Sequence, residues 1–145
     1  MTRINSAIPV KCLTDEHLLA EHREIARLPY CVQKAIRSGS INRVPSVFCL
    51  GKGHVTFFLD KMYFTFNRYR SLREECLKRG FSPIDYSKNW LDVPSVYMQD
   101  YSPRDDDKRL LQERIIQRIT DSPKPYWHYN GKVISKNEAI ELLKS

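Results

Sequence analysis

The chain has 145 residues, enough for one domain with a core of its own, since a typical domain holds about 100–150 residues. A hydrophobic fraction of 41% and an aromatic fraction of 11% exclude a disordered chain, and no apolar stretch approaches the roughly 20 residues of a membrane-spanning helix. The formal net charge of +7 favours a polyanionic partner such as nucleic acid.

The distribution of charge and the pattern of cysteines further restrict the class of protein. Residues 1–85 hold 14 Lys and Arg against 8 Asp and Glu, whereas residues 86–145 hold 10 against 9, so most of the positive charge belongs to the first part. The four cysteines form no CxxC pair and the four histidines complete no zinc spacing, so we expect reduced cysteines and no metal. No apolar core of a signal peptide follows Met1, and we expect a cytoplasmic protein.

The first predicted helix extends from residue 15 to about residue 37. Thr14 suits the N-cap position, and the two acidic residues after it suit the first turn of a helix. One apolar stripe then recurs at helical spacing, formed by Leu18, Ile25, Leu28, Val32 and Ile36. Because Pro29 falls inside this stripe, we expect a kink in one continuous helix.

Further elements follow in the rest of the chain. A turn at residues 51–54 contains two glycines but lacks phosphate-loop spacing, and a second helix is predicted from about residue 55 or 59 to residue 79. Residues 81–103 contain three prolines and are predicted to be irregular. The third predicted helix covers residues 105–120, and its acidic start is interpreted as complementing the helix dipole rather than binding a metal.

The C-terminal part combines an aromatic stretch with a last short helix. Residues 126–134 are expected to pack on the helices or on a ligand, and Ser135 is a candidate N-cap for a helix at residues 136–143. Its aromatic rings at residues 126–129 either close the core or stack on unpaired bases. The pattern as a whole predicts an all-α fold, a compact single domain of three main helices with long irregular loops.

A charged strip flanks the apolar stripe of the first predicted helix. At 100° per residue it comprises His17, Ala20, Arg23, Glu24 and Arg27. Such a strip is typical of an exposed salt-bridged face, but arginines also present a planar fork of donors that suits phosphate. Helical geometry alone leaves both interpretations open.

Five blocks together resemble one family, the pyrimidine-dimer DNA glycosylases with abasic-site lyase activity, of the phage endonuclease V type. The blocks are MTRIN at 1–5, HLLAEHRE at 17–24, LGKGHVTFF at 50–58, ECLKRGF at 75–81 and the aromatic stretch that ends in Gly131 and Lys132. The resemblance covers residues 1–134 and implies a compact all-α domain encoded by a phage or a bacterium, with residues 135–145 as a C-terminal extension. His22 departs from it, since the family has tyrosine there.

The resemblance also implies a reaction and the residues that perform it. The α-amino group of Thr2, exposed once Met1 is removed, would be the nucleophile, and Glu24 matches the catalytic glutamate. The positions that match DNA contacts are Arg3, His17, Arg23, Arg27, Arg114 and Arg118. The implied activity is excision of cyclobutane pyrimidine dimers from duplex DNA, followed by β-elimination at the abasic site through an imine, with no cofactor. We expect a monomer that binds lesion-containing double-stranded DNA.

Two other functions remain open from the sequence. One is a glycosylase of the same scaffold that acts on another damaged or modified base. The other is a non-catalytic helical DNA-binding domain, which needs the same arginines but makes no demand on Thr2 or Glu24.

Overall fold

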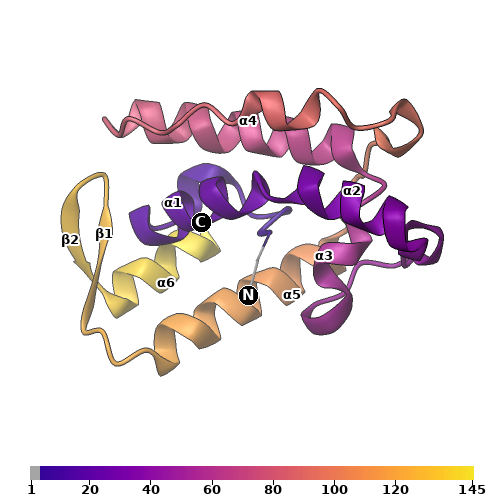
Figure 1. The fold of residues 1–145 in the computed structure, drawn as a ribbon. Coiled ribbons are helices and arrows are strands. Elements are labelled where there is room, and N and C mark those ends of the chain that lie inside the picture. The colour runs from indigo at the N-terminus through magenta and orange to yellow at the C-terminus, as the bar shows by residue number, and fades with distance from the viewer. Residues whose placement is uncertain (1–3) are drawn as a thin grey trace.

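Two separate helices take the place of the single first helix that the sequence predicts. The computed structural model describes residues 4–145, and it contains α1 at Asp15–Ile25 and α2 at Leu28–Ser38 (Figure 1). Pro29 lies in the first turn of α2, where its missing N–H leaves no hydrogen bond unmade. The expectation of one kinked helix is therefore wrong, because the proline begins a new helix instead of bending an old one.

The second predicted helix is divided in a similar way. A short helix, α3, spans His54–Phe57, and the long helix α4 spans Met62–Lys78. Helix α4 ends just before Gly80, which adopts the left-handed conformation with φ of +86°. The third predicted helix is confirmed as α5 at Asp105–Asp121.

The stretch between α4 and α5 is largely irregular, as the sequence predicts. It contains two short 3-10 turns, Ser87–Trp90 and Ser95–Tyr97. Three further 3-10 turns lie earlier in the chain, at Val10–Cys12, Ser40–Arg43 and Gly51–Gly53. Among residues 4–145, no helix is both long enough and apolar enough to cross a membrane.

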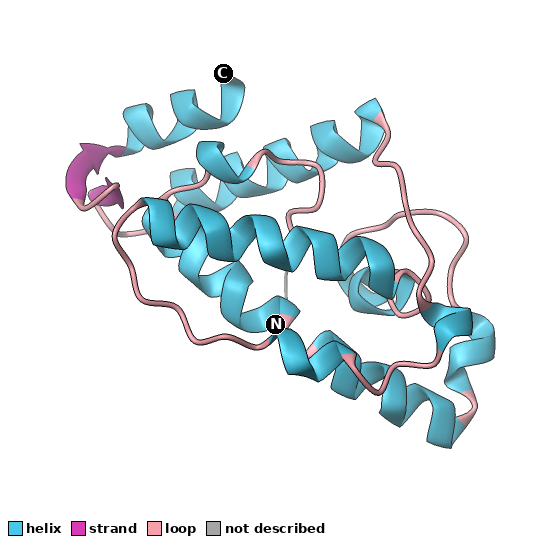
Figure 2. Ribbon diagram, turned by 90° about the horizontal axis from the view of Figure 1, so that it is seen from above, coloured by secondary structure: helices cyan, strands magenta, loops and turns pink. Residues whose placement is uncertain are grey.

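The aromatic stretch near the C-terminus forms a β-hairpin that the sequence analysis missed. Strand β1, Tyr126–Tyr129, pairs antiparallel with β2, Lys132–Ser135, and Figure 2 shows this small sheet at the edge of a helical body. The turn residues Asn130 and Gly131 have φ values of +52° and +80°, as the favoured two-residue hairpin turn requires. The all-α class is confirmed, since the rest of the described framework is helical.

The last residues of the sequence form the predicted last helix. Helix α6, Lys136–Lys144, begins with a capping box in which Ser135 and Glu138 bond to each other's backbone N–H groups. Its buried residues Ala139 and Leu143 pack on α5, and Gln112 of α5 donates to the Leu143 carbonyl at 2.7 Å. Helix α6 therefore contributes to the core beside α5.

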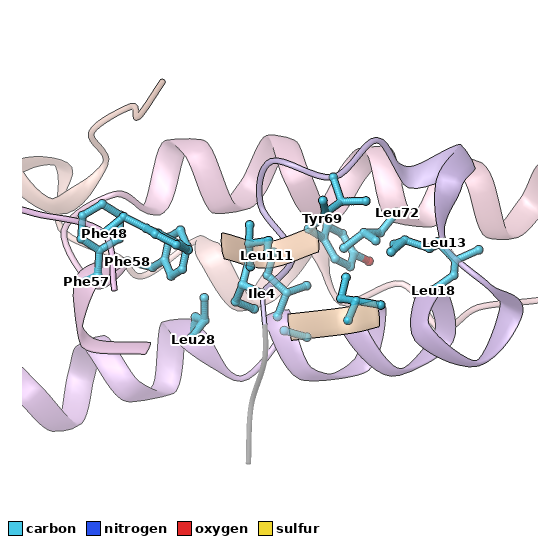
Figure 3. Packing of buried hydrophobic residues seen from close by; sticks show 14 of the residues in the cluster. Ile4, Leu13, Leu18, Leu28, Phe48, Phe57, Phe58, Tyr69, Leu72 and Leu111 are labelled. Atoms are coloured by element: carbon cyan, nitrogen blue, oxygen red, sulfur yellow. The ribbon is translucent and has the colours of Figure 1, made fainter. Parts of the chain in front are cut away.

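The segment that begins at Ile4 passes through the middle of the core. Helices α1 and α4 pack together, and in Figure 3 Ile4 lies between an aromatic group at one end and the side chains of Tyr69 and Leu72 at the other. The side chain of Ile4 is fully buried. The aromatic group consists of Phe48, Phe57 and Phe58, which meet edge to face. The described chain is thus packed into the fold from its first residue, Ile4.

Candidate active site

Three residues of the predicted charged strip, Arg23, Glu24 and Arg27, lie at the break between α1 and α2. Glu24 and Arg23 belong to the last turn of α1, whereas Arg27 is the residue that precedes α2. The backbone N–H of Arg27 donates to the carbonyl of Glu24 at 3.1 Å, which keeps the three residues within one turn. Both arginine side chains are exposed, and Glu24 is partly buried. Exposed arginines suit the phosphates of a polyanionic ligand. A carboxylate between them in the sequence suits positive charge that develops on such a ligand during a reaction.

A predicted DNA contact on α5, Arg114, lies against the N-terminal segment. Arg114 of α5 donates from Nη2 to the side-chain oxygen of Asn5 at 3.3 Å. Asn5 is itself buried, and its carbonyl accepts from Ile8 N at 2.9 Å. Thr2 and Arg3 lie outside the described residues. Arg114 therefore contacts a residue, Asn5, that follows the predicted nucleophile by three positions in the sequence.

Arg118 lies one turn after Arg114 on α5, and its side chain is exposed. Residues one turn apart share a helix face, so the two predicted phosphate contacts on α5 point to the same side of that helix.

His17 is held by the hairpin and by the cap of α1. Its Nδ1 lies 3.0 Å from the hydroxyl oxygen of Thr14, which also accepts the backbone N–H of His17. Its ring stacks on Trp127, with centroids 5.1 Å apart and planes at 18°. Burial lowers the pKa of His17 to about 4. At neutral pH the predicted DNA contact of His17 is therefore one of an uncharged imidazole.

The two acidic residues at the start of α1 anchor the hairpin, a role that the sequence analysis missed. One carboxylate oxygen of Asp15 accepts the N–H of Asn130 at 2.9 Å and the other accepts that of Gly131 at 2.8 Å. Glu16 accepts from the backbone N–H of His128 at 3.0 Å and from Lys124 Nζ at 2.9 Å. Burial raises the pKa of Glu16, but the hydrogen bonds from His128 and Lys124 outweigh it and bring the pKa to about 2.

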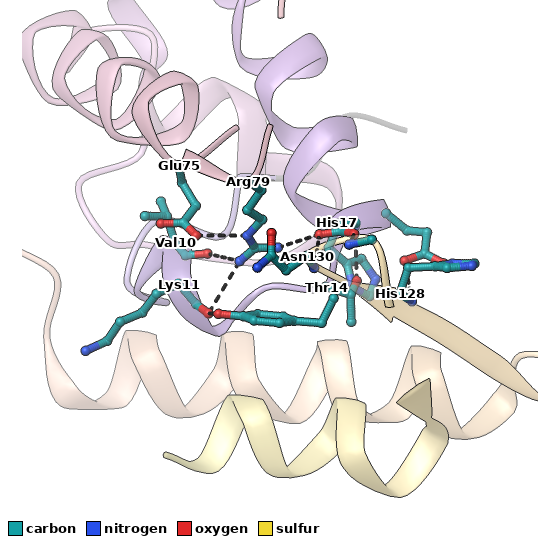
Figure 4. Close-up of polar contacts among 12 residues, drawn as sticks. Val10, Lys11, Thr14, His17, Glu75, Arg79, His128 and Asn130 are labelled. Atoms are coloured by element: carbon teal, nitrogen blue, oxygen red, sulfur yellow. Dashed lines mark hydrogen bonds and ion pairs between the residues drawn. The ribbon is translucent and has the colours of Figure 1, made fainter. Parts of the chain in front are cut away.

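Arg79, at the end of α4, bonds to Asp15 and so connects α4 to the residues that hold the hairpin (Figure 4). Its guanidinium bonds to Asp15 at 2.9 Å and to Glu75 at 2.8 Å, and it lies 4.3 Å from the ring centroid of Tyr129. The Arg68 guanidinium is also buried, where it forms two hydrogen bonds with Glu21 at 2.8 and 3.1 Å. Two of the arginines in residues 1–85 are thus engaged in buried ion pairs and do not face an external polyanion.

The cysteines and metal-ligating side chains stay apart. All four cysteines are free thiols, two of them buried, and burial raises the pKa of Cys76 to about 11. Among residues 4–145 no three His, Cys, Asp or Glu side chains gather as a metal site requires.

Comparison with known proteins supplies the family. A family model described as pyrimidine dimer DNA glycosylase matches residues 1–89, well over half of the chain. The matched range contains the N-terminal segment, the helices α1 to α4 and the strip of Arg23, Glu24 and Arg27. Helix α5, the hairpin and α6 lie beyond it. The chain belongs to the pyrimidine dimer DNA glycosylase family, and DNA is its substrate.

Proposed function

We propose that this protein excises cyclobutane pyrimidine dimers from duplex DNA and then cleaves the abasic strand by β-elimination. The observation that carries the proposal is the partly buried Glu24 between the exposed Arg23 and Arg27, in a chain of this family. The contact of Arg114 with Asn5 adds support, because it places a predicted phosphate contact beside a residue that follows Thr2 by three positions.

The proposed nucleophile is the α-amino group of Thr2, once Met1 has been removed. An α-amino group has a pKa of about 7.7–8.0, against about 10.4 for lysine, so a useful fraction is neutral near pH 7. Its nitrogen forms a bond to the sugar C1′ while the glycosidic bond breaks, and the departing base takes the electron pair and a proton. The bond from C1′ to the ring oxygen then breaks, the ring oxygen takes a proton, and the nitrogen electron pair forms the double bond to C1′. The product is a protonated imine, whose nitrogen keeps its one remaining proton.

Strand cleavage follows from the acidity of the imine. The proton on C2′ is lost, the new double bond forms between C2′ and C3′, and the bond from C3′ to the phosphate oxygen breaks. Water then releases the enzyme. The proposed role of Glu24 is to stabilise positive charge on the sugar and to move protons at the ring oxygen. Every atom transferred comes from the amine, the DNA or water.

The proposed DNA surface combines the arginines of α1, α2 and α5 with His17. Arg23, Arg27 and Arg118 are exposed and available to phosphates. His17 contributes a neutral imidazole, since its pKa is lowered to about 4. Extrusion of a nucleotide from the duplex costs less where a lesion has already weakened pairing. We propose that a monomer performs the whole sequence.

Trapping of the covalent adduct tests this function. Borohydride reduction during turnover on a dimer-containing duplex should give a stable protein–DNA adduct, and peptide mapping should place it on the residue that follows Met1. Thr2→Ala should retain activity, because the hydroxyl does not react. One added N-terminal residue moves the amine about 3.8 Å in Cα terms, beyond its attack distance, and should abolish both steps. An adduct on a lysine contradicts the proposal.

A panel of duplexes tests the substrate. The proposal expects cleavage of a cyclobutane dimer and of a preformed abasic site, but not of undamaged duplex. Faster release of another damaged base than of the dimer would assign the scaffold to that base instead.

A further inference from the structure

The first described residue of the chain is held by a buried histidine. The backbone N–H of Ile4 donates to Nε2 of His54 at 2.9 Å, across 50 residues of sequence. Ile4 is fully buried and His54 is 1% exposed, so water does not compete for this bond. A buried backbone N–H needs a partner, and here an imidazole provides it.

The hydrogen-bond partners of His54 define which of its ring nitrogens bears the proton. Nδ1 lies 3.0 Å from the carbonyl oxygen of Cys49, and a carbonyl only accepts, so the proton of the imidazole is on Nδ1. Nε2 consequently has a free electron pair, which accepts the N–H of Ile4. The ring also meets Phe48 and Phe58 edge to face, at 5.6 and 5.3 Å between centroids. The imidazole is thus fixed in position and in tautomer.

The glycine turn before His54 makes this placement possible. Gly51 has φ of +77°, a conformation that L side chains rarely adopt. A Cβ on Gly53 would lie 2.7 Å from Cys49 Sγ, so a side chain there would push away the residue whose carbonyl holds His54. Gly51 and Gly53 therefore shape the turn around the histidine.

We propose that His54 is a positioning residue for the N-terminal amine. This inference rests on the proposed function, in which the Thr2 nitrogen attacks C1′. Two residues of extended chain reach at most about 7 Å, so the fixed Ile4 nitrogen limits the amine to a small volume. The bond from Arg114 to Asn5 holds the next residue and leaves Ile4 N to His54. His54 itself does not touch the DNA.

A matched pair of variants tests this role. His54→Gln keeps an acceptor near the position of Nε2, whereas His54→Asn keeps only a donor near the position of Nδ1. The assay is the single-turnover rate of borohydride trapping on a duplex with a preformed abasic site. Affinity is measured on a duplex with a tetrahydrofuran site, which forms no imine. Trp90→Phe removes a buried bond to Thr65 and controls for general core damage.

The proposal expects the Asn variant to lose about 100-fold in trapping rate, as a misplaced nucleophile does, at unchanged affinity. The Gln variant should recover most of the rate, and Trp90→Phe should trap as wild type does. An Asn variant at the wild-type rate, or equal losses in the Asn and Gln variants, overturns the positioning role. Mapping of the wild-type adduct separates this failure from failure of the amine mechanism itself.

Nitrogen-15 NMR of histidine-labelled wild-type protein provides a test that needs no variant. His54 should have its proton on Nδ1, and its Nε2 should show coupling across the hydrogen bond to the Ile4 amide. A proton on Nε2 leaves no acceptor for that amide and overturns the proposal even if a variant fails to fold.

Discussion

At the level of single residues, the proposed role of Glu24 predicts that its charge is needed for catalysis and not for DNA binding. Glu24→Gln keeps the size of the side chain and removes the negative charge between Arg23 and Arg27. Binding of a lesion duplex should persist, while single-turnover base release should fall about 100–1000-fold, as when one charge-stabilising group is lost. Glu113→Gln, at an exposed position on α5, is the control. Base release at the wild-type rate would exclude Glu24 from the chemistry.

Glu16 makes the attachment of the hairpin dependent on pH. Its pKa is about 2 in the folded protein, below its ordinary value of 4.5, so the unfolded chain binds the proton more readily. The stabilisation is complete above pH 4.5 and is lost as the pH falls toward 2. Thermal unfolding midpoints should therefore differ between wild type and Glu16→Gln at pH 7 and converge near pH 2. The exposed Glu141→Gln variant should show no such convergence, and a constant difference for Glu16→Gln contradicts the linkage.

At the level of elements, Asp15 connects α1, α4 and the hairpin. Asp15→Ala leaves the buried guanidinium of Arg79 without this partner and removes the acceptor of two turn amides. Because Arg79 keeps its bond to Glu75, we expect the lower end of the about 3–5 kcal/mol that loss of one member of a buried pair costs, which urea unfolding can measure. Asp106→Ala is a matched control in the first turn of α5, since its contact with Arg109 is exposed and worth about 1 kcal/mol or less. Equal losses in the two variants would show that the anchor contributes nothing.

Local signals decided which elements could be predicted. Helices α5 and α6 have clear starts, in an acidic first turn and in the Ser135 capping box, and both predictions are confirmed. The break between α1 and α2 escaped prediction because the apolar stripe continues through it from Ile25 to Leu28. The hairpin escaped because Tyr126–Tyr129 does not alternate apolar with polar residues, although Asn130 and Gly131 are a hairpin signal.

Contacts between segments far apart in the sequence could not be predicted and are seen only in the structure. The strip of Arg23, Glu24 and Arg27 was predictable, since its members lie within one turn of each other. The bond between Ile4 and His54 spans 50 residues, and that between Asp15 and Gly131 spans 116. Spacing in the sequence contains no information on such pairs, because they depend on how the helices pack.

At the level of the whole molecule, fewer cations are free to face a ligand than the net charge of the sequence suggests. Arg68 and Arg79 are used in buried pairs, and Lys124 bonds to Glu16. Among residues 4–145, the predicted DNA contacts that are exposed are Arg23 and Arg27 at the α1–α2 junction and Arg118 on α5. DNA binding should therefore depend on a small number of arginines rather than on the net charge of +7.

The salt dependence of binding tests this surface. Each arginine that neutralises a phosphate releases about 0.9 counterion, so Arg23→Gln, Arg27→Gln and Arg118→Gln should each reduce the slope of log K against log salt by about one unit. Affinity for undamaged duplex should fall by a similar factor, because phosphate contacts are independent of sequence and lesion. Arg109→Gln is the control, since Arg109 is exposed on another side of α5. Binding by a Glu24→Gln background avoids turnover during the titration. A slope that stays at the wild-type value in all three variants, or that falls equally with Arg109→Gln, would remove the junction and α5 from the DNA interface.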